Sequence, residues 1–549
     1  MRAGPCTAIC AGILVAGMPA ASIAQSAPPA RYDWSGLYIG AHLGGGLELT
    51  DVGNPYGSSI YGNTIRAPGP IAGGQTGYNW QHDHLVFGVE ADVSWADLYG
   101  TETCFAYSGF FVSSDCTMRS NVFGTLSGRA GFLVGPDAAT LIYGKAGAAW
   151  VHTDVDASPG GGLGFPATAS SGTQWGWTLG AGIERAISSR WSWKAEYDFA
   201  SMHGNGLSTP ASGFQAVPSG DPNALVAVPS AATRYSPDLH LLKVGLNYRL
   251  SAPSQSASWV PEPLNTLPGS KIEVGLRYVY GWSRFQKDLG IEGTGLRTLA
   301  SRLTYDDNHT NGSEVFARLD TSFGLMVKGF AGWGDGDDGK LNDEDWGIPF
   351  STFVPYSNTY SKVDNEIRYG VIDAGYELWN NAGLRAAPFV GYSIFKQNMT
   401  GYGCFQIVNG NSDCAAAPIP FSTAAIREDD RWQALRLGVA ADFEILPGIT
   451  ISADVAYLPY VRFDGTDDHI LRSLLSPEWA NGTGTQLELI VNYALTDALK
   501  IGIGGRYWAM WTDSGVVNFG GQELVPMRYT VEQAALLVQG SYTFDFGAY

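Results

Sequence analysis

Residues 85–95 read LVFGVEADVSW, and this stretch decides the fold because apolar and polar side chains alternate through it. Phe87 and Val93 share one face of an extended segment while Glu90 and Asp92 share the other, since successive side chains of a β-strand point to opposite sides. A strand with one apolar face and one charged face is typical of a transmembrane β-barrel, which meets lipid outside and encloses a polar lumen.

The same two-residue rhythm recurs in eighteen segments, eight before residue 251 and ten after residue 270. The first two strands are expected near 33–44 and 73–82, and strands three and seven of the later set near 324–333 and 449–464. Long Gly-, Ser- and Thr-rich connections alternate with short turns, and outer-membrane barrels have long external loops and short periplasmic turns. The sequence therefore predicts an all-β chain of two tandem antiparallel transmembrane β-barrels, eight-stranded and then ten-stranded.

Residues 251–270 (SAPSQSASWVPEPLNTLPGS) interrupt the alternation with four prolines and five serines. Proline cannot continue a central strand, so we expect a periplasmic linker here. It would join a first barrel at 25–250 to a second at 271–549. A single eighteen-stranded barrel is the alternative, because eight plus ten is also a porin-sized number. The linker and the closure-like strand end at Val244–Leu250 favour two barrels.

The amino terminus has the form of a secretory signal peptide. Met1-Arg2 leads into an apolar run from Ala8 to Met18, which ends in small residues before a cleavage site expected after Ala24. Cys10 lies too early in the run for a lipoprotein signal. Residues 1–24 are thus expected to be removed, and the remaining chain is expected in the outer membrane of a Gram-negative cell with its long loops outside.

Composition limits the classes of partner. The net charge of −19 argues against nucleic-acid binding, which normally needs a basic face, so outer-membrane lipid is the expected partner. The cysteines Cys104 and Cys116, and Cys404 and Cys414, each close a short segment and are expected to form two disulfides in an exported protein. Neither segment adds a well-spaced histidine, so we expect no metal site and no cofactor.

Two short motifs at the external side of the second barrel carry chemistry. Asp343 and Asp345 follow its third strand, and Asp467 and His469 follow its seventh. Residues two apart in an extended segment point the same way, so an Asp-x-Asp pair can face an Asp-x-His pair across the barrel mouth. A histidine oriented by an aspartate can take a proton from water, while two close carboxylates hold that water and return a proton.

Alternative interpretations of these motifs remain open. Acidic external loops are ordinary, and the aspartates of 335–343 also fit a calcium-binding loop. If the alternation of Val461 and Phe463 continued unbroken, Asp467 and His469 would face lipid. We therefore expect a bulge or turn at Gly465 that resets the phase.

The first barrel resembles the small porin-family surface barrels of Gram-negative bacteria over roughly residues 30–250. The segments that carry the resemblance are Asp33–Gly40, Tyr143–Ala148 and Lys243–Leu250. The resemblance implies a structural or surface-antigen protein and no enzymatic role. An eight-stranded barrel is also too narrow for an open pore, since side chains fill it.

The second barrel resembles the omptins, ten-stranded outer-membrane proteases, over roughly residues 271–549. The resemblance rests on Ser301–Tyr305, Val327–Trp333, Asp364–Ile367 and the Asp-x-Asp-Trp and Asp-x-His motifs. It implies an aspartic-type endopeptidase that cleaves a peptide or protein by water attack. Asp343 and Asp345 would be the carboxylate pair, Asp467 the orienting partner and His469 the base, with lipopolysaccharide as an activator.

Two departures from the omptin pattern bear on specificity. Omptins that cut between basic residues carry an acidic floor, but Gly465 stands two residues before Asp467 and Lys287 stands where a glutamate is expected. We therefore expect no dibasic preference, and the basic residues that would grip lipopolysaccharide do not align. The rival hypothesis is a non-catalytic structural or adhesive surface protein, or a porin-like barrel.

Overall fold

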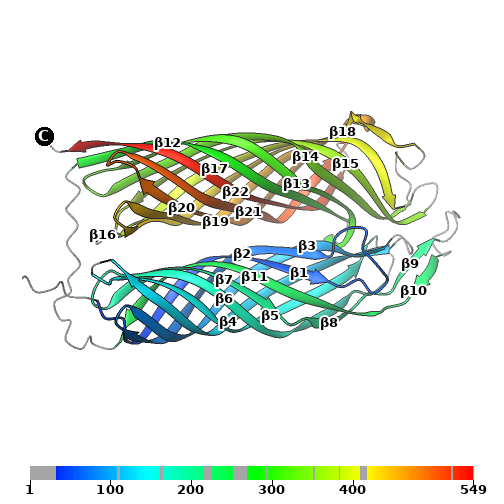
Figure 1. The fold of residues 1–549 in the computed structure, drawn as a ribbon. Coiled ribbons are helices and arrows are strands. Elements are labelled where there is room, and N and C mark those ends of the chain that lie inside the picture. Colours follow the sequence, from blue (N-terminus) through cyan, green and yellow to red (C-terminus); the bar gives the residue numbers. More distant parts are fainter. Residues whose placement is uncertain are drawn as a thin grey trace, which may run out of the picture.

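The chain folds into two β-barrels that lie side by side with their axes in nearly the same direction (Figure 1). This computed structural model describes residues 32–107, 112–135, 137–160, 165–215, 225–250, 269–291, 295–349, 353–381, 384–408, 414, 417–520 and 523–547. The expected signal peptide, 1–24, and residues 251–268 of the expected linker lie outside the described residues. No helix in the described ranges is long and apolar enough to cross a membrane.

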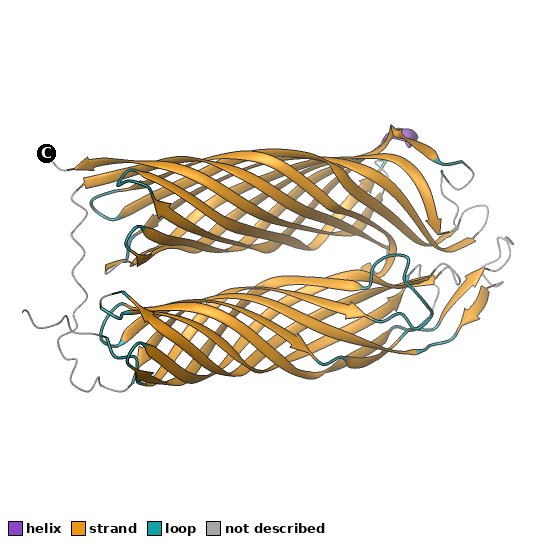
Figure 2. Ribbon diagram, in the orientation of Figure 1, coloured by secondary structure: helices purple, strands orange, loops and turns teal. Residues whose placement is uncertain are grey.

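Long strands make up nearly all of both barrels, and loops lie at the barrel ends (Figure 2). The first ring contains β1 (Gly36–Val52), β2 (Thr64–His82), β3 (Leu85–Tyr107), β4 (Val112–Val134), β5 (Thr140–Pro159), β6 (Thr168–Ala186), β7 (Trp191–Met202) and β11 (Ala232–Arg249). Strand β8 (Asn205–Ser208) also pairs with β11, and β9 (Ser212–Gln215) pairs with β10 (Leu225–Val228) in a small separate sheet.

The second ring contains β12 (Gly269–Ile291), β13 (Gly295–Asp320), β14 (Leu325–Pro349), β15 (Phe353–Tyr376), β17 (Leu384–Val408), β18 (Ile419–Leu446), β19 (Ile449–His469), β20 (Leu474–Ala494), β21 (Leu499–Phe519) and β22 (Glu523–Gly547). Strand β16 (Trp379–Asn381) also pairs with β17, and a single helical turn, η2 (Ile470–Arg472), follows β19.

Each ring closes on itself. Strand β1 pairs with β11, and β12 pairs with β22, both antiparallel. Closure gives every spanning strand two neighbours, as lipid requires, because lipid supplies no partner for backbone N–H and C=O groups. The prediction of an eight-stranded barrel followed by a ten-stranded one is confirmed, and the alternative of one eighteen-stranded ring is wrong.

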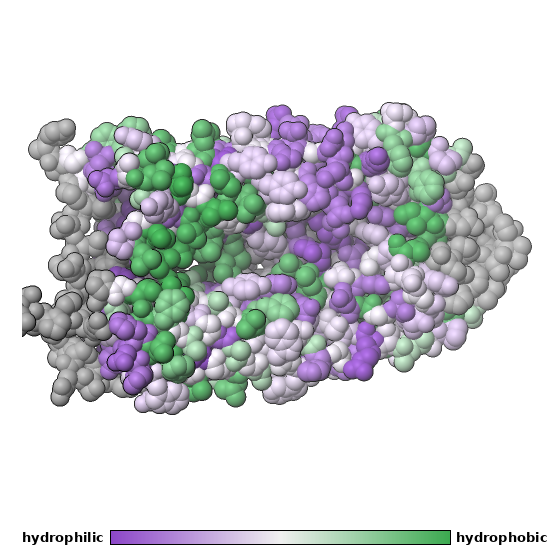
Figure 3. Space-filling model, viewed as in Figure 1, coloured by the Kyte–Doolittle hydropathy of each residue, from purple (hydrophilic) through white to green (hydrophobic). Residues whose placement is uncertain are grey.

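The outer faces of the barrels are apolar and the inner faces polar. Phe87 and Val93 on β3 are 51% and 53% exposed, whereas Glu90 and Asp92 are only 1% and 2% exposed. On the face shown in Figure 3, hydrophobic side chains gather over the half of the molecule nearer the C-terminus, and polar ones over the other half. The alternation in 85–95 thus sorts side chains between lipid and lumen, as predicted.

A row of exposed aromatic side chains, which we call the external girdle, lies on the outer wall of the second barrel. It includes Trp282 on β12, Trp333 on β14 and Tyr460 on β19, which are 41%, 54% and 53% exposed. Aromatic girdles of this kind lie at the membrane interface. Parts of these strands beyond the girdle therefore project from the membrane on the side opposite the C-terminus.

The strands extend further outward than the sequence predicted. The strand expected at 33–44 is Gly36–Val52, and that expected at 324–333 is Leu325–Pro349. Beyond the membrane a strand needs no lipid-facing apolar row, so the sequence signal stops while backbone pairing continues. Residues 335–343 accordingly lie within β14, where Asp335 and residues 340–343 pair with both neighbouring strands and an irregularity falls between them, so they do not form the external loop of the calcium interpretation.

Charged side chains fill the lumen of the first barrel. Arg129 lies 2.6 Å from Glu184, and Lys145 lies 2.8 Å from Glu196. Lys243 lies 2.8 Å from Asp198 in the same network. All of these side chains are at most 3% exposed, so ion pairs rather than an open channel occupy the lumen.

The outer part of the β3–β4 hairpin, around the Cys104–Cys116 disulfide, contacts the outer wall of the second barrel beyond the girdle. The second predicted disulfide, Cys404–Cys414, also forms. Asp115 on the hairpin lies 2.6 Å from Arg302 on β13, and the Thr103 hydroxyl donates to Glu344 on β14 at 2.6 Å. We call this contact the inter-barrel clasp; it holds the first barrel against β12–β14.

Arginine in the middle of the apolar band is expected to destabilise the second barrel. Leu276→Arg replaces a side chain that is 66% exposed on the lipid face of β12. It should make folding into vesicles less favourable by about 2–4 kcal/mol. The control is Leu475→Arg on β20, where a 59% exposed leucine lies beyond the girdle and the cost should be about 0–1 kcal/mol. Equal costs in urea titrations would contradict the assigned membrane position.

The clasp is expected to stabilise the chain through the Arg302–Asp115 pair. Arg302 also pairs with Asp288, so it keeps a partner without Asp115, but removing Arg302 leaves the buried Asp115 carboxylate without its cation, at a cost of about 3–5 kcal/mol. A double-mutant cycle of Arg302→Met with Asp115→Asn should give a coupling energy above about 1 kcal/mol. The exposed pair Arg119–Asp97 is the control and should give about 0.2–1 kcal/mol; additive effects at the buried pair would count against the clasp.

Candidate functional site

The candidate residues lie on two strands on opposite sides of the second ring. Asp343 and Asp345 lie on β14, and Asp467 and His469 lie on β19, all beyond the external girdle. Strands β15, β17 and β18 separate β14 from β19 on one side of the ring, and five strands separate them on the other. The two motifs therefore form parts of extended strands rather than the loops that the sequence predicted.

A bulge in β14 turns the carboxylate pair inward. Gly336 pairs with Asn365 of β15, but the next pair joins Gly339 to Val363, so one extra residue is inserted in β14. A bulge of this kind shifts the alternation of faces by one position. Trp333 points outward before the bulge, and odd-numbered residues after it, Asp343 among them, point into the lumen.

Strand β19 has its own bulge, around Pro459. Leu458 pairs with Gly484 of β20, and the next pair joins Val461 to Gly482. Tyr457 before the bulge and Tyr460 within it are both exposed on the outer wall, at 42% and 53%. The faces of β19 therefore exchange at Pro459, before the motif begins.

This exchange places Val461 and Phe463 in the lumen, where both are 0% exposed. Asp467 and His469 lie four and six residues after Phe463, so they share its face and point into the lumen as well. The prediction of a phase reset at Gly465 is wrong, because Gly465 pairs with β18 and β20 in unbroken register. The premise that Val461 and Phe463 meet lipid was the source of the error.

Asp467 divides its two oxygens between a histidine and a lysine. Its Oδ1 lies 3.1 Å from His469 Nδ1, and its Oδ2 accepts a 2.6 Å hydrogen bond from Lys287 Nζ. Burial opposes ionisation of Asp467, but the charges of Lys287 and His469 outweigh it and lower its pKa to about 2. Asp467 is therefore an anion that can orient the imidazole.

The pKa values of the carboxylate pair, Asp343 and Asp345, are raised, whereas that of Asp467 is lowered. Burial, followed by the charge of Asp345, raises the pKa of Asp343 to about 7, against the lowering effect of His469. Burial also raises the pKa of Asp345 to about 6, opposed by a hydrogen bond from Ser301 and by the charge of Arg472. Because His469 acts on Asp343, the two motifs are close enough to interact across the mouth.

Sequence reasoning missed three acidic residues beneath this mouth and identified Lys287 only as a departure from the omptin pattern. Lys287 on β12 contacts Glu428 on β18 and Glu478 on β20 as well as Asp467. Asp430 on β18 lies in the same group. The alternation of β18 and β20 could have placed these acids on inner faces, but nothing local shows that strands far apart in the chain bring them together with Lys287.

A layer of apolar side chains crosses the lumen near this acidic group. Phe285, Trp432, Phe463 and Tyr529 lie in one buried cluster, with the rings of Trp432 and Phe463 4.6 Å apart. Such a layer separates the external mouth from the lower part of the lumen. It argues against the porin-like interpretation of this barrel.

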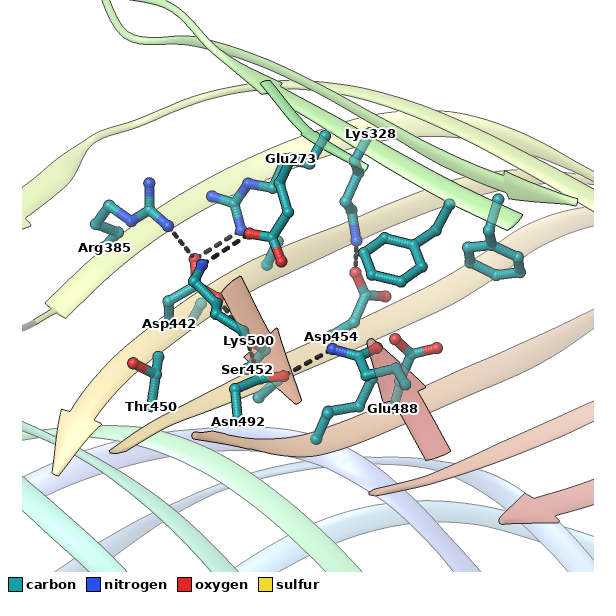
Figure 4. A pocket seen from close by; sticks show the side chains of 18 of the residues that line it. Glu273, Lys328, Arg385, Asp442, Thr450, Ser452, Asp454, Glu488, Asn492 and Lys500 are labelled. Carbon is teal, nitrogen blue, oxygen red and sulfur yellow. Dashed lines mark hydrogen bonds and ion pairs between the residues drawn. The ribbon is translucent and has the colours of Figure 1, made fainter. Parts of the chain in front are cut away.

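A cavity of about 270 Å³ lies in the lower lumen of the second barrel, among the charged side chains shown in Figure 4. Arg385 lies 3.1 Å from Asp442, Lys500 lies 2.9 Å from Glu273, and Lys328 contacts Asp454. These basic groups are each paired with an acid. The cavity therefore has the character of a polar lumen neutralised by its own side chains, and none of the predicted site residues lines it.

Comparisons with known proteins match both barrels to outer-membrane proteins. Residues 9–218 match the outer membrane protein beta-barrel domain, and residues 277–518 match the Protochlamydia outer membrane protein family. The 31 kDa outer-membrane immunogenic protein of Brucella melitensis is 30% identical over 250 residues, which cover 44% of this chain and 94% of that relative. The chain belongs to this outer-membrane β-barrel family.

Another family member, the 22 kDa outer membrane protein of Rhizobium leguminosarum, is 31% identical over 179 residues, which cover 32% of this chain and 68% of that relative. Membership places the chain in the outer membrane, where its outward faces contact lipid and lipopolysaccharide. Both relatives align with less than half of this chain.

Among solved structures, the outer membrane protease OmpT from Escherichia coli is 12% identical, aligns with 52% of this chain and 99% of its own, and has a TM-score of 0.41. OprG from Pseudomonas aeruginosa is 13% identical, aligns with 41% of this chain and 100% of its own, and has a TM-score of 0.29. Likenesses at these scores carry no functional argument.

The raised pKa of Asp343 predicts a pH-dependent stability. Its folded-state pKa of about 7 lies above the ordinary value of 3.8, so the stabilisation from protonated Asp343 is full below about pH 4 and is lost as the pH rises through about 7. Asn cannot ionise, so Asp343→Asn should stabilise the protein more at pH 8 than at pH 5. The difference should exceed about 1 kcal/mol, since one pKa unit corresponds to about 1.4 kcal/mol.

Urea unfolding of refolded protein at the two pH values measures this effect. The matched control is Asp337→Asn, an exposed carboxylate on the same strand, which should change stability equally at both. If Asp343→Asn behaves like Asp337→Asn, Asp343 does not hold its proton at neutral pH.

Proposed function

We propose that the chain acts at the cell surface as a two-barrel outer-membrane protein, in which the first barrel has a structural, non-catalytic role. The names of the relatives, outer-membrane immunogenic proteins, support a surface-exposed barrel. The ion pairs that fill its lumen leave no place for a substrate. In this proposal residues 1–24 are removed on export, and residues 251–270 join the barrels on the periplasmic side.

For the second barrel, we propose an omptin-like site that hydrolyses peptide bonds by water attack. Asp343 and Asp345 would hold the water and return a proton to the leaving amine, Asp467 would orient His469, and His469 would take a proton from the water. The observation that supports this is that Asp343 on β14 and His469 on β19 both point into the mouth, with Asp467 Oδ1 3.1 Å from the imidazole and the pKa of Asp343 raised by burial. Lipopolysaccharide is the proposed activator, and no cofactor is needed.

A non-catalytic surface barrel is the second candidate for residues 271–549. The observation that favours it is Lys287, whose ammonium binds Asp467 and competes with His469 for that carboxylate. The family that matches residues 277–518 is named for an outer membrane protein and not for a protease. In either case the ammonium of Lys287 and the absence of a side chain at Gly465 disfavour an arginine-binding floor, so no dibasic preference is proposed.

Cleavage of a peptide library by the full chain, refolded with lipopolysaccharide, decides between these candidates. His469→Ala should lower the rate by about 10²–10⁴-fold, the usual contribution of a general base. The matched control is His309→Ala, because His309 is also an external histidine of this barrel, with its Nδ1 2.8 Å from Asp338. Equal cleavage by His469→Ala and the parent chain would contradict the proposed site, and no cleavage by either would favour the non-catalytic candidate.

A further inference from the structure

Three buried carboxylates form a compact group below the mouth of the second barrel. Glu428 and Asp430 on β18 and Glu478 on β20 each offer a carboxylate oxygen, and these oxygens all lie within 4.8 Å of one another. The three residues are 0%, 0% and 2% exposed. They face the lumen because they share the inner face with Trp432 on β18 and Ala480 on β20.

The existing contacts leave half of this group unsatisfied. Lys287 Nζ contacts Glu428 Oε1 and lies 3.3 Å from Glu478 Oε1, and Gln397 Nε2 donates to Asp430 Oδ2 at 2.8 Å. The other oxygens, Glu428 Oε2, Asp430 Oδ1 and Glu478 Oε2, are buried with no hydrogen-bond partner among the described residues. Buried carboxylate oxygens are normally hydrogen-bonded or bound to a cation.

The local charge balance points the same way. Asp467, Glu428 and Glu478 share the Lys287 ammonium, and Asp430 lies beside Glu428 and Glu478, so four carboxylates gather near one ammonium. One ammonium cannot neutralise this group, and unpaired buried charge is strongly unfavourable. A second positive charge would relieve the excess.

Two neutral oxygens near the group also lack partners. Ser476 Oγ lies two residues before Glu478 on the same face of β20, and Tyr305 Oη lies on β13; both residues are 0% exposed, and neither atom has a partner in the described structure. Tyr305 lies close enough to Glu428 for that charge to add to burial in raising its pKa. Hydroxyl oxygens of this kind complete the coordination of oxygen-binding cations.

We infer that Glu428, Asp430 and Glu478 bind a divalent cation with an all-oxygen ligand set, and that Ca²⁺ is the ion that fits. Ca²⁺ takes oxygens at about 2.3–2.6 Å in flexible geometry, so two of its ligands lie up to about 5 Å apart. Mg²⁺ holds ligands at about 2.0–2.1 Å and demands a tighter octahedron, with ligands at most about 4.2 Å apart. The three oxygens lie within 4.8 Å of one another, a range that the longer and more flexible bonds of Ca²⁺ span without rearrangement of the strands.

This inference does not rest on the proposed peptide hydrolysis, since none of the three ligands is among the four residues assigned to that reaction. It also departs from the sequence-based expectation of no metal site. The ligands come from strands β18 and β20 on either side of β19, so their meeting depends on the register of the barrel and not on any local motif.

Terbium luminescence tests the site directly. Tb³⁺ replaces Ca²⁺ in oxygen sites, and Trp432, two residues from Asp430 on the same face, is placed to sensitise it. The full chain, refolded in neutral detergent without lipopolysaccharide, is titrated with TbCl₃. We expect one bound ion per chain, displaced by CaCl₂ at concentrations at least about tenfold lower than by MgCl₂.

Conservative variants identify the ligands. Glu428→Gln, Asp430→Asn and Glu478→Gln should each weaken Tb³⁺ binding at least tenfold, whereas Asp429→Asn, the outward neighbour between two ligands, should bind like the parent chain. Trp432→Phe should lower the luminescence but leave Ca²⁺ binding by calorimetry unchanged. The proposal fails if the folded parent chain binds no stoichiometric ion, or if folded ligand variants bind as tightly as Asp429→Asn. Cleavage is not measured, so the outcome is separate from the test of hydrolysis.

Discussion

Closure of each sheet is the constraint on which the rest of the structure depends. Lipid offers no hydrogen-bond partner to the backbone, so a spanning strand must pair on both sides, and only a closed ring provides this for all strands. The seams β1–β11 and β12–β22 meet that requirement separately. Each barrel is therefore complete in the membrane by itself. The clasp contacts between the barrels involve the parts of the strands beyond the girdle.

The number of strands then sets what each lumen holds. Eight strands enclose a space that side chains fill, and ion pairs such as Lys145–Glu196 occupy it. Ten strands leave room for an apolar layer around Trp432, with a charged mouth on one side and a charged cavity on the other. The candidate site is consequently in the second barrel, in the part beyond the girdle.

Alternation of faces is a local property, so the sequence was sufficient to predict the strands, the two rings and which side of β3 meets lipid. The two disulfides were predicted from the short spacing of the cysteines in an exported chain. It was insufficient where one inserted residue changes the phase: the bulge at Pro459 was missed, and a bulge was placed at Gly465 instead. It was also insufficient where residues meet only through the register of distant strands. Lys287, Glu428 and Glu478 lie on three strands, and the clasp joins Asp115 to Arg302 across two barrels.

The clasp and the acidic group act on the candidate site from opposite sides. Glu344, held by Thr103 of the first barrel, lies between Asp343 and Asp345, so the first barrel fixes the strand that carries the carboxylate pair. Lys287 links Asp467 to Glu428 and Glu478, so any added positive charge at those acids weakens their hold on the ammonium. The ammonium then binds Asp467 more strongly, and less of that carboxylate's charge remains for His469. The lysine thus couples the charge state of the lumen to the histidine at its mouth.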